Sequence, residues 1–358
     1  MALTRLSRAL ATLLLVVTST AVGFGFVEIA VRAFATEPVY CAADGVFPGF
    51  QHAIATNYFV RDRILGFAPG PGWKGARGRR GFQNGAEYAG MAGSGLDIVL
   101  LGDSVIQSQL LEQGLKRLLT GFAVRIWNAG IGGYNTLQEA YYLERRTRVA
   151  PHVIVVGFCL NDFLPSMTIA GDRSRRTMTQ NLFEPIGRVS PFWFRHSALY
   201  RMVALRVLLP RDSGSLWSAD TVRRNRPVVS EGLSRIRRYA AEHGATLVVA
   251  VYPHLRADDD YLRAAHDTVL AVLDELAIDA IDLQAIYDEL GFDPARLRLS
   301  PDDVVHPNAE GHLVAAAEIV RRLAPRLGIT ERAADRLIAE RAPSGSPLRR
   351  HGQRHHGA

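Results

Sequence analysis

From about residue 95 onward, the chain alternates between two patterns of hydrophobic positions. Short apolar runs that predict buried strands lie at 97–102, 122–127, 152–158, 245–251 and 278–283. Amphipathic stretches that predict helices lie between and after them, at 107–120, 136–148, 230–243, 261–276 and 309–327. This alternation favours a parallel sheet covered by helices on both faces. We therefore expect an α/β domain that binds its ligands at the carboxyl ends of the strands.

One interval interrupts the alternation. Between Asp162 and Ser230 the chain carries a basic stretch at 173–176, an aromatic cluster at 192–194 and a helix-like stretch at 198–209. A structureless loop of that length is unusual inside a compact domain. We interpret residues 163–229 as an inserted cap, which either shapes a substrate pocket beside the strand ends or packs at the periphery.

The N-terminal segment predicts a membrane anchor. From Ala9 to Val27 there is no charged residue, and this length is about enough to span the hydrocarbon core. Arg5 and Arg8 precede the stretch, so the positive-inside rule places the N-terminus in the cytoplasm and the rest of the chain on the periplasmic or extracellular side. A cleaved signal peptide, which would give a secreted protein, is the alternative, because a small-x-small pair lies around Ser19–Ala21.

These patterns divide the chain into four parts. They are an n-region with the anchor or signal peptide at 1–34, a Gly/Pro-rich lead at 35–94, the α/β domain at 95–328, and a C-terminal helix with a basic tail at 329–358. The tail from residue 341 contains four arginines and no acidic residue, and we expect it to be disordered.

Composition limits the partners of the chain. Of its 358 residues, 48% are hydrophobic and 22% charged, and the net charge is +7. The arginines of the tail supply much of that charge, and no basic helix carries a nucleic-acid-binding pattern. We therefore expect no nucleic acid as a partner. The two cysteines, Cys41 and Cys159, do not make a disulfide framework.

The first apolar run ends at Gly102-Asp103-Ser104. A strand that stops at a glycine and presents a serine hydroxyl is one way in which α/β enzymes expose a nucleophile, although these are also ordinary turn residues. A second segment, Asp303-Val304-Val305-His306-Pro307, offers a base and an acid. We predict Ser104 as the nucleophile, His306 as the base that takes its proton, and Asp303 as the group that orients the imidazole.

Two more segments follow strand ends and offer donors for a developing oxyanion. The second run leads into a glycine-bearing turn that contains Gly133, and the third run ends near the amide side chain of Asn161. Acyl transfer needs such donors, because negative charge collects on the carbonyl oxygen in the transition state. The neighbouring Asp103 and Asp162 are interpreted as structural.

Other residues compete for these roles. His254 ends the fourth run, His312 lies on the helix after His306, and Asp302 neighbours Asp303. We prefer His306 because it alone follows an aspartate at this spacing. No second His/Asp cluster has the spacing of metal ligands, and no phosphate-binding glycine loop follows the first strand. We therefore expect neither a metal nor another cofactor.

The four blocks around Ser104, Gly133, Asn161 and Asp303–His306 resemble the SGNH branch of the GDSL hydrolases, which are bacterial esterases and lipases. The resemblance covers about residues 95–165 and 230–327. It implies a flavodoxin-like three-layer α/β/α sandwich with a five-stranded parallel sheet. It also implies the nucleophile and first oxyanion donor at Ser104, further donors at Gly133 and Asn161, and the base and its partner at His306 and Asp303.

Two positions depart from the family pattern. Gln107-Ser108 stand where the family often has a glycine, and Cys159 stands in place of the usual glycine two residues before Asn161. The departures affect the shape of the pocket more than the path of the proton, so the mechanism is expected to persist.

The resemblance implies a membrane-anchored serine esterase that hydrolyses carboxylic esters through an acyl-enzyme outside the cytoplasm. Its substrate would be an acylated small molecule, lipid or glycan. Two alternatives stay open. One is an O-acyltransferase or deacetylase that modifies a cell-envelope polysaccharide, and the other is a catalytically silent envelope scaffold.

Overall fold

The structure is a computed structural model. It describes residues 2–34, 59–62, 65–69, 82–85, 87–88, 95–163, 193, 197–203, 218–256 and 260–349. The chain divides into two compact units, one made of Met1–Ala55 and Met178–Ser213 and the other of Thr56–Thr177 and Gly214–Ala358. Most of the predicted cap, most of the Gly/Pro-rich lead and the tail after residue 349 lie outside the described residues.

Five parallel strands form the sheet of the second unit. They are β3 (Leu96–Gly102), β4 (Val124–Gly130), β5 (Val153–Cys159), β6 (Thr246–Tyr252) and β7 (Asp279–Asp282). The strand order is β4-β3-β5-β6-β7, which is the flavodoxin-like order. The predicted strands and the parallel sheet are confirmed. The central strands are apolar along their length because helices bury both of their faces.

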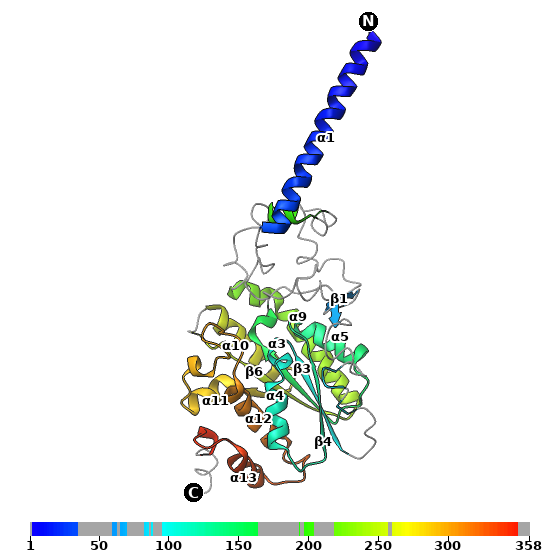
Figure 1. The fold of residues 1–358 in the computed structure, drawn as a ribbon. Coiled ribbons are helices and arrows are strands. Elements are labelled where there is room, and N and C mark those ends of the chain that lie inside the picture. The colour runs from blue at the N-terminus through cyan, green and yellow to red at the C-terminus, as the bar shows by residue number, and fades with distance from the viewer. Residues whose placement is uncertain are drawn as a thin grey trace. The chain divides into compact units, whose positions relative to one another are not determined.

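Helices cover the two faces of this sheet (Figure 1). One layer contains α5 (Thr136–Arg146), α9 (Ala219–Glu242) and α10 (Asp260–Glu275), which pack against one another. The other contains α4 (Leu110–Leu118), α12 (Ala309–Leu323) and α13 (Glu331–Arg341). The short helix α11 (Leu283–Glu289) follows β7 and packs against β6. The predicted three-layer α/β/α sandwich is therefore confirmed.

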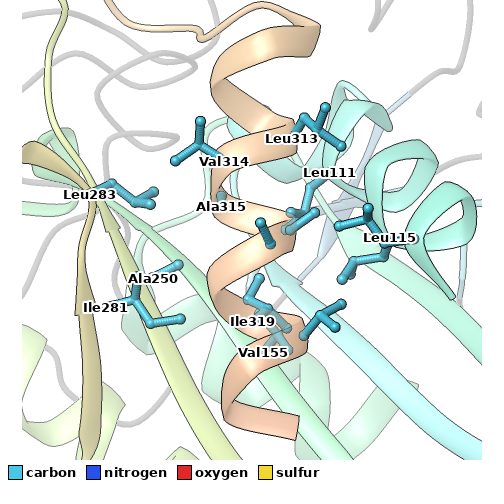
Figure 2. Close-up of a cluster of buried hydrophobic side chains, with 14 of the residues drawn as sticks. Leu111, Leu115, Val155, Ala250, Ile281, Leu283, Leu313, Val314, Ala315 and Ile319 are labelled. Carbon is cyan, nitrogen blue, oxygen red and sulfur yellow. The ribbon is translucent and has the colours of Figure 1, made fainter. Parts of the chain in front are cut away.

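The layer of α4 and α12 covers one of the two apolar faces of the sheet. Figure 2 shows Leu111 and Leu115 of α4 beside α12, whose Ile319 lies near the strand residues Val155 and Ala250. All of these side chains are fully buried. Burial of one such leucine or isoleucine stabilises the fold by about 1.5–3 kcal/mol. This packing fixes the helix that follows His306 against the central strands β5 and β6 of the sheet that also carries Ser104.

Helix α9 begins earlier than the hydrophobic pattern predicts. The pattern predicts a helix from residue 230, but α9 starts at Ala219 and contains Pro227. A proline inside a helix removes one backbone hydrogen bond, and for this reason the sequence places the boundary after it. The buried Val222 and Val229 continue the inward-facing stripe on both sides of Pro227. Residues 219–229, predicted as part of the cap, therefore belong to a layer of the sandwich.

The C-terminal segment differs from its prediction as well. Ala342 and Leu348 are buried in the same core as α4 and α12, and the Arg349 guanidinium donates to the Ala342 carbonyl at 2.8 Å. Apolar burial thus orders a stretch whose composition resembles that of a solvated tail. The prediction of disorder from residue 341 onward is wrong for residues 341–349.

Two smaller features complete the described structure. In the second unit, β1 (Phe59–Asp62) and β2 (Gly66–Pro69) form an antiparallel pair. In the first unit, α1 (Ala2–Phe34) contains the stretch Leu10–Ala33, which is long and apolar enough to cross a membrane. The same unit contains the short helix α8 (Ala198–Val203).

Candidate active site

Ser104 lies at the carboxyl end of β3, where the strand turns into the short helix α3 (Ser104–Gln107). Asp103 is the N-cap of this helix, and its Oδ1 accepts a hydrogen bond from the Val105 N–H at 2.8 Å. An acidic N-cap satisfies a backbone donor that a helix start leaves without a partner. The predicted exposure of the serine at a strand end is therefore what the local backbone produces.

A row of three glycines seats this turn on the sheet. Gly102 pairs with Gly130 on one side and with Gly157 on the other, so the three lie side by side on β4, β3 and β5. A β-carbon at Gly102 or Gly157 would lie within 2.4 Å of the Ile106 side chain, and one at Gly130 would lie 2.5 Å from the Gln107 nitrogen. The absence of these carbons lets α3 pack directly on the strand ends.

The structure brings Ser104, His306 and Asp303 together. The Nε2 atom of His306 lies 2.8 Å from the Ser104 Oγ, and its Nδ1 atom lies 2.9 Å from Asp303 Oδ2. The imidazole thus bridges a hydroxyl and a carboxylate that are separated by about 200 positions in the chain. If Nδ1 carries the proton that Asp303 accepts, Nε2 is left as the acceptor for the serine hydroxyl.

Asp303 is held in place by the backbone that follows it. Its Oδ1 accepts hydrogen bonds from the Val305 N–H at 3.0 Å and from the His306 N–H at 2.9 Å. Burial by itself would raise the pKa of Asp303, but these N–H groups and the nearby imidazole outweigh it and lower the pKa below its ordinary value. Asp303 is therefore a carboxylate at neutral pH, as a partner for an imidazolium must be.

The predicted oxyanion donors reach the same edge of the sheet, but they differ in whether a hydrogen-bond acceptor already occupies them. Asn161 lies in the 3-10 turn η2 (Leu160–Phe163) after β5, and its Nδ2 donates to Asp103 Oδ2 at 3.2 Å. The Ser104 N–H also interacts with the Asp103 carboxylate. The Gly133 N–H, by contrast, has no hydrogen-bond acceptor among the residues that the structure describes. An amide NH₂ carries two hydrogens, so Asn161 keeps one for a further acceptor.

Gln107 fixes the loop that carries Gly133. Its Oε1 accepts a hydrogen bond from the Gly132 N–H at 2.5 Å. A β-carbon at Gly132 would lie at that same distance from the Gln107 Oε1. Gly133 has a φ of +82°, a left-handed conformation that glycine adopts without strain. The glutamine that departs from the family pattern therefore accepts from the backbone amide next to the predicted donor Gly133.

Three carboxyl groups lie buried around these donors. Asp103, Asp162 and Glu139 are 1%, 2% and 1% exposed. Asp162 accepts from the Thr136 hydroxyl at 2.5 Å, whereas both side-chain oxygens of Glu139 have no hydrogen-bond partner among the described residues. Burial raises the pKa of all three groups, and their mutual repulsion raises those of Asp162 and Glu139 further. These surroundings therefore favour the protonated forms of the three carboxyl groups.

The competing candidates lie elsewhere. His312 is fully buried, its Nδ1 lies 3.2 Å from the Tyr252 hydroxyl, and burial lowers its pKa to about 3. The Nε2 atom of His254 lies 3.9 Å from the Cys159 Sγ, and burial raises the pKa of that thiol well above its ordinary value. Asp302 is exposed. None of these three side chains makes a described hydrogen bond to Ser104. No group of three or more His, Cys, Asp or Glu in the described residues could hold a metal ion.

The sequence assigns no role at this site to three of its polar residues. Asn128 comes directly after the second predicted strand, but it lies inside β4, where its Nδ2 donates to Glu112 Oε2 at 3.0 Å. Gln107 stands out only as a departure from the family pattern, and Glu139 only as part of a predicted helix. A signal for Glu139 is its position four residues before the buried Leu143, because residues four apart lie on the same face of a helix.

Comparison with known proteins now gives the family. The model of the GDSL-like Lipase/Acylhydrolase family matches residues 100–314, a range that contains Ser104, Asn161 and His306. The chain therefore belongs to this family, and it is a hydrolase that acts on ester bonds. No curated protein matches the chain.

Several solved structures are similar to the chain. Axe2, an acetylxylan esterase from Geobacillus stearothermophilus, is 16% identical with a TM-score of 0.41, covering 67% of this chain and 97% of its own. LAE5, an α/β hydrolase from the metagenome of Lake Arreo in Spain, is 15% identical with a TM-score of 0.39, covering 64% and 95%. The acetyl xylan esterase AlAXEase is 14% identical with a TM-score of 0.37, covering 63% and 98%. The family assignment rests on the family model.

Proposed function

We propose that the protein is a serine esterase in which Ser104, His306 and Asp303 act as a catalytic triad. The observation that carries this proposal is the 2.8 Å contact between His306 Nε2 and the Ser104 hydroxyl, with Nδ1 of the same ring on Asp303. A base within hydrogen-bond reach of a hydroxyl, itself oriented by a carboxylate, is the arrangement that activates a serine.

The steps follow from this geometry. Ser104 Oγ attacks the ester carbonyl carbon while His306 Nε2 takes the hydroxyl proton, and Asp303 stabilises the imidazolium. The carbonyl oxygen becomes an oxyanion that the Gly133 N–H and the Asn161 amide stabilise, together with the Ser104 N–H. His306 then gives its proton to the leaving alcohol, which leaves an acyl group on Ser104. Water, deprotonated by His306, releases the acid and restores the serine.

We further propose that α1 anchors this activity to a membrane. Its apolar stretch Leu10–Ala33 is long enough to span a bilayer, and the basic residues Arg5 and Arg8 precede it. By the positive-inside rule the enzyme then works on the non-cytoplasmic side. Carbonate extraction of the full-length protein from membranes tests the anchor, since a cleaved signal peptide would release the enzyme in soluble form.

A serine-directed fluorophosphonate probe tests the mechanism. Labelled wild-type protein is digested and the modified peptide is identified by mass spectrometry, while hydrolysis of p-nitrophenyl acetate is followed in parallel. We expect the label on Ser104, and we expect Ser104→Ala to lose both the label and the hydrolysis while it unfolds at the wild-type temperature.

Ser108→Ala is the matched control for that experiment. Ser108 lies one turn further along the same segment, and its hydroxyl donates to the Val105 carbonyl at 2.7 Å. It should keep the label and most of the activity. Unchanged turnover in Ser104→Ala would overturn the serine mechanism.

A further inference from the structure

The carboxylate of Glu28 joins α1 to a second helix of the first unit. It accepts hydrogen bonds from the Ser197 hydroxyl at 2.8 Å and from the N–H groups of Ala198 and Leu199 at 2.8 and 3.0 Å. On its own helix, the Arg32 guanidinium donates to it at 2.6 Å. These four donors come from two segments that are about 170 positions apart in the chain, so Glu28 is a specific tertiary contact.

The contact gives hydrogen-bond partners to polar groups that are costly to leave without them. The first N–H groups of any helix have no partner within the helix, and at the start of α8 Glu28 accepts from two of them. A carboxylate within an apolar, membrane-spanning stretch is costly without partners. Ser197 completes the arrangement, because its hydroxyl also accepts from the Tyr200 N–H at 3.0 Å.

Exposed apolar side chains lie on the two segments that this contact joins. In the described residues, the exposed large apolar side chains lie in α1, at Trp193 and at Val203, and otherwise only at Leu299. Trp193 is 56% exposed, and its carbonyl accepts from the Ser197 N–H at 2.8 Å. Such patches on a protein surface mark places that contact a partner or a membrane. Here the exposed Trp193 and Val203 belong to α8 and the residues just before it, and α8 packs against the apolar helix α1.

The length of α1 sets the level of this contact in a bilayer. At about 1.5 Å per residue, 20 residues span the hydrocarbon core of roughly 30 Å. Counted from Leu10, where the apolar stretch begins, that core ends near Ile29. Glu28 and the start of α8 then lie at the boundary with the headgroups, which is where tryptophan is enriched in membrane proteins.

We propose that Trp193 and the helix α8 form a second membrane contact, which lies in the headgroup interface beside α1 and is held there by Glu28. The proposal rests on the membrane anchor of the proposed function, and it is independent of the ester chemistry. Two membrane attachments that are joined through Glu28 would restrict the orientation of the chain where it leaves the bilayer more than a single helix can. The occupant of this surface is the lipid of the interface.

Fluorescence quenching by brominated lipid tests the proposal. The full-length protein is inserted into phosphatidylcholine–phosphatidylglycerol vesicles with and without bromine on the acyl chains, and flotation verifies insertion. The difference between wild type and Trp193→Phe isolates the emission of Trp193 from that of the other tryptophans. We expect this emission to be largely lost in the brominated vesicles.

Glu28→Ala tests the role of the carboxylate. The variant makes α1 more apolar, so it should still float with the vesicles, but the quenching of Trp193 should fall. Glu275→Ala, which removes an exposed carboxylate that pairs with Arg226, is the control and should keep the wild-type quenching.

Two outcomes would overturn the proposal. Failure of the wild type to float would remove the anchor on which it rests. Equal Trp193 emission in both kinds of vesicle, with the protein inserted, would show that this surface does not contact lipid; protection of Trp193 from acrylamide would then assign it to a protein partner. Because p-nitrophenyl acetate hydrolysis is measured on the same samples, a failure of the esterase proposal is seen separately.

Discussion

Asp103 adjoins Ser104 and Asp303 reaches it through His306, but their surroundings move their pKa values in opposite directions. Asp303 is partly exposed and accepts two backbone N–H groups and an imidazole, which lower its pKa. Asp103 is buried, and burial raises its pKa in spite of the N–H groups and the amide around it. The same side chain thus serves as a charged partner of His306 on one side of the serine and as part of a crowded acidic group on the other.

The difference shows how two carboxyl groups near one nucleophile acquire separate tasks. On the Asp303 side each oxygen has a donor, and the charge faces the base. On the Asp103 side, Asp162 and Glu139 add buried carboxyls whose oxygens are only partly satisfied, and burial there favours the protonated form. The predictions below test these two sides, beginning with the largest effect.

Asp303→Asn should have the largest effect on catalysis. The amide can donate to Nδ1, which favours the imidazole tautomer with its proton on Nε2, where it cannot take the serine proton. We expect kcat/KM for p-nitrophenyl acetate to fall about 10⁴-fold, with little change in melting temperature. Asp302→Asn, one position away and exposed, should retain wild-type kinetics, and equal losses in the two variants would refute the role of Asp303.

Asp103→Asn should have a smaller effect on the rate. Asparagine can still cap α3 through Val105, but it presents an NH₂ group where Oδ2 accepts from Asn161. We expect kcat to fall about 100-fold, as for the loss of one oxyanion donor, with KM nearly unchanged. Since a buried charge is removed, the free energy of unfolding should not fall. A variant that loses stability in proportion to activity would show that Asp103 serves only the fold.

Gln107→Ala probes the loop between the two sides. Without the Gln107 Oε1, the Gly132 N–H loses its acceptor, and Gly133 is no longer held beside the serine. We expect a loss of about tenfold in kcat, less than for removal of a donor. Gln113→Ala, at an exposed position on α4, is the control. Steady-state kinetics on a series of acyl lengths would show whether the loop also limits the pocket, because the loss would then depend on the acyl chain.

Glu139→Gln should leave the rate nearly unchanged and alter the pH dependence of stability. When folding raises the pKa of a glutamate, the free energy of unfolding of the protein falls as pH rises above the unfolded pKa of about 4.3. The wild type should therefore become less stable between pH 5 and pH 8, and the variant should lose less stability over the same range. Urea unfolding at the two pH values measures this, with the exposed Glu242→Gln as the control. Parallel curves for wild type and Glu139→Gln would contradict the raised pKa.

Much of the fold follows from local pattern. The five strands could be predicted because strands buried on both faces are continuously apolar, and the edge that carries Ser104, Asn161 and Gly133 follows from parallel topology. The pairing of Asp303 and His306 with Ser104 was predicted from spacing and residue type, and the structure places these side chains within hydrogen-bond distance.

What could not be predicted depends on tertiary burial. Glu139 has the residue type of a solvated helix face, and only the packing of α5 against the sheet buries it. Pro227 suggests a helix boundary that long-range contacts of Val222 and Val229 override. Leu348 lies in a stretch whose composition resembles a solvated tail, yet its side chain is buried in the core. In each case, the local preference is weaker than the free energy of burying a neighbouring apolar surface.

The row of Gly102, Gly130 and Gly157 has a consequence for protein engineering. The height of the nucleophile above the sheet is set by three missing β-carbons, and not by any contact that a designer would add. Transplanting this serine turn onto another parallel sheet would therefore begin with deletions on three adjacent strands. Alanine at any one of them would tilt the turn and move the hydroxyl away from its base before a single catalytic residue had been changed.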